Sequence, residues 1–371
     1  MLKNRGQLKY FFDVLRAISI LGVCLSHIVQ TFTTSNDNFL NEAAYQTFYL
    51  GRFGVEAFFF LSGCLMCHLY SSDSQTQISN RGIIVKRFAR IYPLWLLFFL
   101  VYVLQASVFN SGNWILAQNK MSNVFNEFTG IVLSFLTLLF LLWIFPPIFD
   151  MVIPGGWSIQ MEIFHYIIFL FVRKKSTIFI CIIGIFSNLI CLVLVNHSYE
   201  LTSNLQKILK SFTLNSTFWY FASGIFLVKT IQQIKKKIKT IEIVKKNFLK
   251  LTLYVTYSLS TFALPLYSGP HLLALIFLIF SIIASWLISD TIVLRKMAQM
   301  IAKYSYFMYF FHFIQIKLIE RYNLSNYFSD LIGSYCVLYL FIILISGLPI
   351  AFLSHKYFEM PTRKYLNTYA K

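Results

Sequence analysis

Apolar residues dominate this chain in long runs, and polar or charged residues gather in short stretches between the runs. Eleven apolar segments are recognisable, and most approach the ~20 residues that a helix needs to cross a bilayer. The pattern predicts an all-α fold, a polytopic bundle of transmembrane helices. The segments lie near residues 10–30, 48–70, 88–108, 130–149, 157–172, 176–195, 212–229, 250–267, 271–289, 304–320 and 331–353.

The basic residues favour ten crossings over eleven. Lys and Arg cluster at the N-terminus, at 81–90, at 173–175, at 229–250, at 295–303 and in the C-terminal tail, which together hold 26 of the 32. Cytoplasmic loops are rich in Lys and Arg, so we expect these clusters and both termini on the cytoplasmic side. Five apolar segments separate 81–90 from 229–250, so this orientation requires that one of the five does not span.

The segment at 130–149 is the candidate for the one that does not cross. It ends in Pro146-Pro147 and leads into Pro154-Gly155-Gly156. Non-helical backbone at membrane depth is tolerated where protein buries it. We therefore expect a re-entrant or surface-lying segment on the outer side. The alternative is eleven true spans, with Arg173–Lys175 outside.

Composition supports an integral membrane protein with a single domain over residues 1–371. The chain is 57% hydrophobic and 12% charged, whereas a soluble domain is about 25% charged. The net charge of +18 is explained by cytoplasmic loops, so no nucleic-acid partner is expected. The first apolar segment has no A-x-A-like cleavage site and is expected to be retained as a span. The six cysteines all fall in apolar segments, which predicts buried hydrophobic side chains rather than disulfides.

Arg16 and His27 are ionisable residues inside the first apolar segment, which also contains Asp13. Eleven residues make about three helical turns, which places both on one face about 16 Å apart. A cationic side chain in a spanning helix costs about 2.5–3.5 kcal/mol on insertion scales, so such a residue suggests function. The spacing predicts a positive charge near the inner face and an imidazole near the outer face.

Further arginines begin the third apolar segment. Arg87 and Arg90 are three residues apart, hence on one face of a helix. With Arg16, and with Asp13 beside it, they predict a cytoplasm-facing cluster that suits phosphate, because the guanidinium group offers donors in a fixed geometry. The alternative is cytoplasmic anchoring of the helix. Anchoring explains Arg16 badly, because this residue lies within the apolar run.

Two carboxylates are expected near His27. Glu56 in the second segment and Glu162 after Gly156 both fall in the outer half of the predicted spans. A neutral imidazole oriented by a carboxylate is suited to take a proton from a hydroxyl. The competing interpretation is a structural polar network between helices. The distance from Arg16 to His27 is also comparable to an extended pantetheine arm, so coenzyme A bound by its nucleotide on the inside would present its thioester near the outer face.

Six short motifs occur in order along the chain. They are Asp13-x-x-Arg16 followed by His27, Phe59-Phe60-Leu61-Ser62-Gly63, Arg87-x-x-Arg90-Ile91-Tyr92-Pro93, Trp157-Ser158-x-x-x-Glu162, Ser305-Tyr306-x-x-Tyr309-x-x-His312 and Glu359-x-Pro361. Together they resemble the membrane-bound acyltransferase 3 family of bacterial carbohydrate O-acyltransferases, nearly from end to end. One departure is local, since the family commonly has Phe where this chain has His165.

The resemblance implies transfer of an acyl group, usually acetyl, from cytoplasmic acyl-CoA to a sugar hydroxyl of an extracytoplasmic glycan. It implies a multi-pass protein of the bacterial inner membrane, with acetyl-CoA or another acyl-CoA as donor substrate. No permanently bound cofactor or metal is expected. His27 is implied to be essential, acting as a general base or transiently carrying the acyl group, and the arginines are implied to hold the donor. The acceptor remains open among O-antigen, exopolysaccharide, capsule, peptidoglycan and lipid-linked oligosaccharides.

Some signals point elsewhere and carry less weight. Cys64-x-x-Cys67-His68 matches a haem attachment pattern but lies at the inner end of a span, where haem is not expected. Glu162-x-x-His165 resembles half of a di-iron motif, without a second half. His312 is expected either to stack on Tyr309 or to line a donor channel.

Two other classes of protein compete with the enzyme. A secondary transporter of an anionic metabolite would use the arginine cluster as its substrate site, but the matched pair of interrupted spans typical of transporters is not visible. A structural membrane subunit would have no need for Arg16 and His27 inside an apolar helix.

Overall fold

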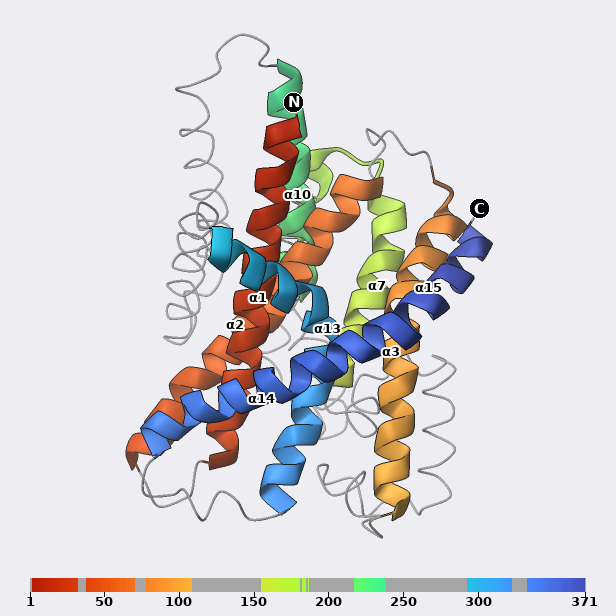
Figure 1. Cartoon of the computed structure of the whole chain (residues 1–371). Helices are drawn as coiled ribbons and strands as arrows, with labels where there is room; N and C mark the ends of the chain where they lie inside the picture. Colours follow the sequence, from red (N-terminus) through yellow and green to blue (C-terminus); the bar gives the residue numbers. More distant parts are fainter. Residues whose placement is uncertain are drawn as a thin grey trace, which may run out of the picture. The chain divides into compact units, whose positions relative to one another are not determined.

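The computed structural model describes residues 2–32, 38–70, 78–108, 155–180, 182–184, 186, 217–237, 292–321 and 332–370. In these ranges the regular structure is entirely helical (Figure 1). The all-α class predicted from the apolar segments is therefore confirmed for the described residues. The predicted non-spanning segment, 130–149, lies outside them.

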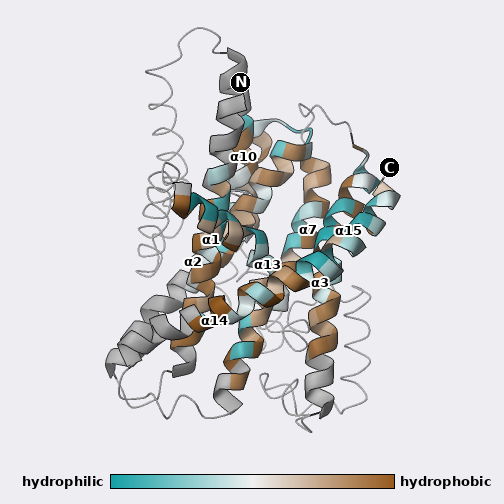
Figure 2. Cartoon of the chain, in the orientation of Figure 1, coloured by the Kyte–Doolittle hydropathy of each residue, from teal (hydrophilic) through white to brown (hydrophobic). Residues whose placement is uncertain are grey.

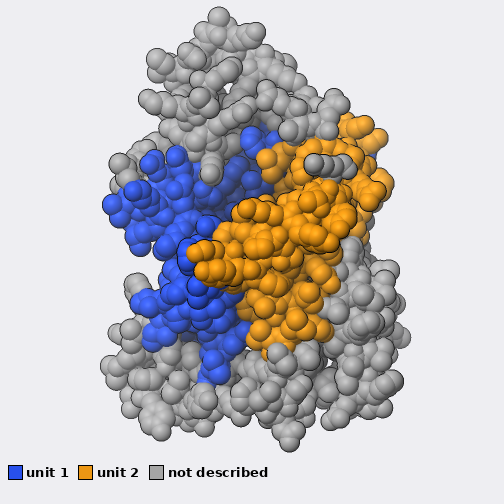
Figure 3. Space-filling view, turned by 45° about the vertical axis from the view of Figure 1, so that its right-hand side comes forward, with its two compact units in different colours: residues 1–68, 176–181, 220–353 blue, residues 69–175, 182–219, 354–371 orange. Residues whose placement is uncertain are grey.

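The chain divides into two compact units, coloured separately in Figure 3. Unit 1 holds residues 1–68, 176–181 and 220–353, and unit 2 holds residues 69–175, 182–219 and 354–371. The helices that lie wholly or mainly in unit 1 are α1 (Leu2–Phe32), α2 (Asn38–Tyr70), α10 (Thr217–Lys237), α13 (Ile292–Arg321) and α14 (Ile332–Ser354). Those of unit 2 are α3 (Asn80–Val108), α7 (Gly156–Val172), the π-helix η3 (His355–Glu359), α15 (Met360–Asn367) and the 3-10 helix η4 (Thr368–Ala370).

Seven helices coincide with predicted apolar segments, namely α1, α2, α3, α7, α10, α13 and α14. Two stretches of the described residues are helical, long and apolar enough to cross a membrane, Phe12–Val29 and Phe53–Tyr70, and a shorter apolar helix covers Met161–Val172. The structure gives the burial of three of the six cysteines, Cys24, Cys64 and Cys67, and all three are buried as predicted.

Helices α1 and α13 pack side by side and run parallel. Arg295 lies over the Tyr10 ring at 4.4 Å at one end of the contact, and the rings of His27 and His312 lie 5.4 Å apart at the other. The spacing along the chain from Tyr10 to His27 equals that from Arg295 to His312, so the two helices stay in register. Between these points a small apolar cluster forms around Val14, Ala17 and Ala298, with Ile18 and Ile301 packed against it. The parallel direction agrees with the expectation that both helices begin at the same membrane face.

Helix α2 packs antiparallel to α1 through glycines. A Cβ at Gly51 would lie 2.5 Å from Ser26 Oγ, and a Cβ at Gly54 would lie 2.5 Å from the carbonyl oxygen of Ser19. Such separations leave no room for a side chain, so glycine allows the two backbones to approach closely. In lipid the hydrophobic effect does not drive helices together, so helices associate by close packing through small residues.

Helices α2 and α10 also pack closely through glycines, at the Ser62-Gly63 motif. A Cβ at Gly63 would lie 2.0 Å from the Phe221 carbonyl oxygen, and one at Gly224 would lie 2.2 Å from the carbonyl oxygen of Phe60. The Cys64 Sγ donates to the Gly224 carbonyl oxygen at 3.5 Å. The motif therefore has a packing role in this fold.

Replacing Gly63 with alanine is expected to destabilise unit 1 by about 1–3 kcal/mol, because the methyl group meets backbone that cannot rotate away. Thermal unfolding of the purified protein in detergent measures this. Gly347→Ala is the matched control, since a Cβ there would lie 2.7 Å from Sδ of the flexible Met308 side chain and 3.4 Å from Phe311 Cδ1, an ordinary contact, and would meet no backbone atom as closely. Equal melting temperatures for the two variants would contradict the expectation.

Unit 2 is organised around α3. Helices α7 and α15 and the helical turns η3 and η4 all contact it. A Cβ at Gly82 would lie 2.7 Å from the Ala370 carbonyl oxygen, so the chain's last turn packs directly on the start of α3. Figure 2 shows that α15 is mostly hydrophilic, in contrast to the apolar later part of α3. The C-terminal segment thus joins the polar end of α3.

Candidate functional site

Helix α1 carries the first three candidate residues without interruption. Asp13, Arg16 and His27 all lie between Leu2 and Phe32. Eleven residues of continuous helix separate Arg16 from His27 by about 16 Å, as expected. Both side chains are partly buried. The predicted helical spacing between Arg16 and His27 is therefore present in α1.

His27 meets a second histidine in unit 1. Its ring centroid lies 5.4 Å from that of His312 and 4.7 Å from that of Phe313. The parallel register of α1 and α13 produces this meeting. His312 also lies 6.1 Å from the Tyr309 ring, edge to face, so the predicted stacking on Tyr309 is confirmed. The closer neighbour, His27, was not expected.

The hydrogen bonding of His312 fixes where its proton lies. Nδ1 is 3.0 Å from the carbonyl oxygen of Met308, and a carbonyl oxygen only accepts, so Nδ1 carries the hydrogen. In the neutral ring, Nε2 then presents a lone pair. His312 is fully buried, and its Nε2 has no hydrogen-bond partner among the described residues. The structure thus leaves an acceptor unused beside His27.

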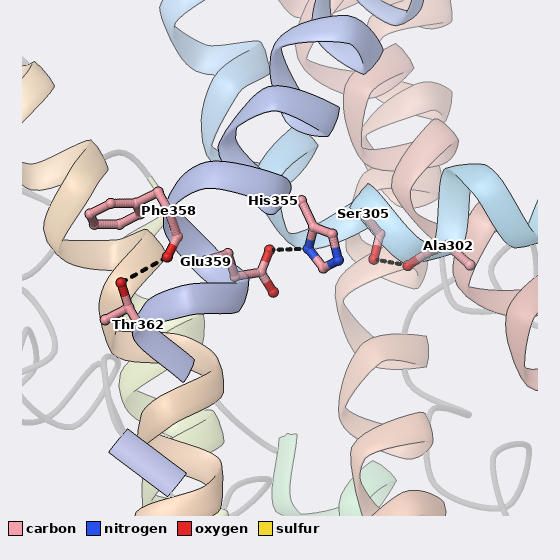
Figure 4. Close-up of polar contacts among 6 residues, drawn as sticks. All are labelled: Ala302, Ser305, His355, Phe358, Glu359 and Thr362. Atoms are coloured by element: carbon pink, nitrogen blue, oxygen red, sulfur yellow. Dashed lines mark hydrogen bonds and ion pairs between the residues drawn. The ribbon is translucent and has the colours of Figure 1, made fainter. Parts of the chain in front are cut away.

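Ser305, the first residue of the late motif on α13, bonds within its own helix. Ser305 Oγ donates to the carbonyl oxygen of Ala302 at 2.9 Å (Figure 4), and Ser305 is buried. The side chain bonds back into its own helix, a common way for serine to satisfy its hydroxyl away from water. Ser305 therefore has no donor left for a substrate in this arrangement.

Glu56 is buried on α2 in unit 1. The contacts of Gly51 with Ser26 and of Gly54 with Ser19 set the register of α1 and α2. The expected proximity of Glu56 to His27 stays a prediction.

Arg87 is the central residue of the candidate site in unit 2. Its guanidinium carbon lies 5.0 Å from the centroid of the Tyr70 ring and 5.5 Å from that of the Tyr166 ring. The side chain is only 5% exposed, and its Nε has no hydrogen-bond partner among the described residues. A buried donor left unpaired costs about 1–3 kcal/mol, and more when it is charged. The arrangement is suited to an incoming anionic acceptor.

Glu162 and Arg90 lie around the same tyrosine. The Tyr166 hydroxyl donates to Glu162 Oε1 one helical turn away on α7. The charges of Glu162, Arg87 and Arg90 all act on that hydroxyl. The structure therefore brings Arg87, Arg90 and Glu162 together around Tyr166.

The start of α7 sets where Glu162 lies. Gly155 has a positive φ of 73°, a conformation that glycine adopts readily, and the helix begins at the next residue. Ser158 Oγ donates to the Gly155 carbonyl oxygen at 2.9 Å. Ser158 thus closes the first turn, and Glu162 follows one turn later.

His165 packs inside unit 2. Its Nε2 lies 3.3 Å from Thr217 Oγ1, its ring lies 5.8 Å from the Phe218 ring, and the residue is fully buried. These contacts tie α7 to the first residues of α10. His165 therefore has a packing role in unit 2.

Sequence reasoning missed several residues of these two clusters. Tyr70, Tyr166 and Phe313 have no charge or motif spacing that marks them as ligands. The C-terminal Arg363 was counted only as part of a basic tail, although it lies among the charges of unit 2. Each unit is described by itself, so the expected proximity of His27 to Glu162, and of Arg16 to Arg87, stays a prediction.

Comparison with known proteins bears on the chain as a whole. Searches of curated proteins and of solved structures find no match. A family model described as "Acyltransferase domain" matches residues 9–353. Members of this family are typically membrane-embedded, and the family suggests acyl transfer to carbohydrates. The match includes both clusters described above, and the chain belongs to the acyltransferase 3 family.

Proposed function

We propose that this acyltransferase moves an acyl group, acetyl in the first instance, from acyl-CoA to a sugar hydroxyl of an extracytoplasmic or lipid-linked surface glycan, at the bacterial inner membrane. The observation that carries the proposal is the pairing of His27 with His312 inside the region that the family model matches. A histidine beside a second imidazole with an unused lone pair is suited to proton transfer.

In the proposed reaction His27 acts as general base. Its imidazole nitrogen takes the proton of the acceptor hydroxyl, and the oxygen attacks the thioester carbonyl carbon. The tetrahedral intermediate collapses, the carbon–sulfur bond breaks, and the leaving CoA thiolate takes the proton back from the imidazolium. Nothing is consumed besides the two substrates. Glu162 is proposed to tune this site, and Glu56 stays a candidate for the same role.

The donor is proposed to bind through the arginines. Arg87 and Arg90 offer planar donors in unit 2, and Arg16, with Asp13 beside it, lies about three helical turns from His27 on α1. Arginine is suited to diphosphate because its donors reach two oxygens at once. The buried Nε of Arg87, which has no hydrogen-bond partner among the described residues, supports this assignment most directly.

His312 is proposed to position His27. Replacing His312 with phenylalanine keeps a ring in the buried space but removes the lone pair beside His27. We expect kcat for acyl transfer to fall about tenfold to hundredfold, with the KM for acyl-CoA changed less than twofold, because acid–base positioning acts on the chemical step. Steady-state kinetics of the purified enzyme measure both constants. An unchanged kcat, in a variant that melts like the wild type, would rule out this role.

A deletion strain tests the function and identifies the acceptor. Its surface glycans are analysed by proton NMR and mass spectrometry for ester-linked acetyl, with and without the restored gene. We expect a specific O-acetyl group to disappear on deletion and to return with the wild-type gene only. Uptake of an anionic metabolite into proteoliposomes without any covalent product would instead favour the transporter.

A further inference from the structure

The C-terminal segment beyond α14 is built into unit 2. After Ser354 the chain makes a π-helical turn, His355–Glu359, and continues as α15. The turn is held by a 2.8 Å contact between His355 Nδ1 and Glu359 Oε2, and Thr362 Oγ1 donates to the Phe358 carbonyl oxygen at 2.7 Å (Figure 4). Isolated π-helical turns are rare and are frequent at functional sites. The turn precedes Arg363 by one helical turn of α15.

Arg363 lies on α15, which packs on the helix that carries Arg87 and Arg90. Helix α15 and the turn η3 both contact α3, and the packing of Ala370 against Gly82 holds the end of the segment in place. The charges of Arg90, Glu359 and Arg87 all act on the Arg363 guanidinium. Burial, followed by the neighbouring charge of Arg90, lowers the pKa of Arg363. Three guanidinium groups therefore gather at the polar end of α3.

Two carboxylates lie near this cluster and compensate part of its charge. Glu359 contacts His355 and also acts on Arg363, and Glu162 accepts from Tyr166. Three guanidinium groups outnumber these two carboxylates, so a positive charge remains, and its self-repulsion is strongest where water is excluded. A dianionic group would offset this charge and supply an acceptor for Arg87 Nε, which has none among the described residues.

We propose that Arg363 joins Arg87 and Arg90 in a three-arginine site for phosphate, and that the diphosphate of acyl-CoA occupies it. This assignment rests on the proposed function for the identity of the donor, but the three-arginine site itself does not. Arg363 lies outside residues 9–353, so nothing in the family match assigns it a role. Arg363 is then a donor-binding residue contributed by the C-terminal segment.

The test compares Arg363→Gln with Lys364→Gln in the full-length protein in phosphatidylcholine nanodiscs. Both variants lose one positive charge from the same helix, but Lys364 is exposed. Binding of CoA is measured by titration calorimetry, and the KM for acetyl-CoA by initial rates. We expect Arg363→Gln to raise both constants about tenfold, with kcat nearly unchanged, and Lys364→Gln to change each less than twofold. Equal effects of the two variants would overturn the proposal.

Three further measurements locate the contact. An acetyl thioester of pantetheine, which has no diphosphate, should show the same KM with wild type and Arg363→Gln; a tenfold change with this donor would overturn the proposal. An effect that appears only when phosphatidylglycerol is added would assign the site to lipid and overturn the CoA assignment. Arg363→Lys keeps the charge and should retain part of the affinity, which guards against a loss caused by misfolding.

Binding of pyrophosphate distinguishes a failure of the three-arginine site from a failure of the proposed function. If the wild type transfers nothing from acyl-CoA but binds pyrophosphate, and binding weakens in Arg363→Gln but not in Lys364→Gln, the donor is wrong and the three-arginine site stands. If acyl-CoA is used and Arg363→Gln behaves as wild type with both probes, the function stands and the three-arginine site is wrong.

Discussion

The His27→Ala variant is expected to transfer no measurable acyl group, a loss of at least about 10³-fold. The reason is that a sugar hydroxyl is a poor nucleophile until a base takes its proton, and positioned acid–base catalysis contributes about 10²–10⁴-fold. The measurement is transfer of radiolabelled acetyl from acetyl-CoA to the glycan acceptor, with purified protein and with membranes from the complemented deletion strain.

The variant must fold for this result to be informative. His27 is only partly buried, and its ring packs on Phe313 as well as on His312, so we expect a melting temperature within a few degrees of the wild type. His68→Ala is the matched control, because His68 is exposed near the end of α2. Acylation by His27→Ala at more than a tenth of the wild-type rate would refute the proposed chemistry.

The same assay separates the two roles that the sequence leaves open for His27. Wild-type protein is mixed with radiolabelled acetyl-CoA in the absence of acceptor and then quenched. Label that stays on the protein, and that His27→Ala does not acquire, would identify a covalent acyl-histidine intermediate. A protein without label would support direct attack by the deprotonated hydroxyl.

Much of the fold was predictable because apolar length and positive charge are local signals. The runs at 10–30, 48–70 and 304–320 each became one helix, and the run at 157–172 corresponds to α7. The pairing of helices was not predictable in this way. The residues of one apolar run do not indicate which other run it packs against. Helix α1 packs against α13, although the two helices are far apart in the sequence.

The candidate site also contains residues that the sequence could identify and contacts that it could not. Arg16, His27, Arg87 and Arg90 could be selected because each puts charge or an imidazole into an apolar helix. The meeting of His27 with His312 depends on register between two helices almost three hundred residues apart, and spacing within one helix says nothing about it. The register of α1 and α2 likewise depends on contacts between the helices, at Gly51 and Gly54, and spacing within one helix does not predict it.

Neutralising Arg87 is the second large effect that we expect. Arg87→Gln should raise the KM for acetyl-CoA by about tenfold to hundredfold, because a hydrogen bond to a charged group is worth about 1.5–3 kcal/mol and each 1.4 kcal/mol is a factor of ten. Arg87→Lys should restore little of this loss, because an ammonium group lacks the planar donors that lie between the rings of Tyr70 and Tyr166. Lys86→Gln, one residue earlier on α3, is the matched control for charge.

The Arg87→Gln variant should use the donor less well than the wild type, but it should not be less stable. Removing a charge that is 95% buried, with its Nε unpaired among the described residues, relieves a desolvation cost of several kcal/mol. The two cation–π contacts that are lost are worth about 1–2 kcal/mol each at most. The melting temperature of the substrate-free protein should therefore stay level or rise while the KM increases. A fall in melting temperature with an unchanged KM would mean that Arg87 holds α3 to its neighbours and does not bind the donor.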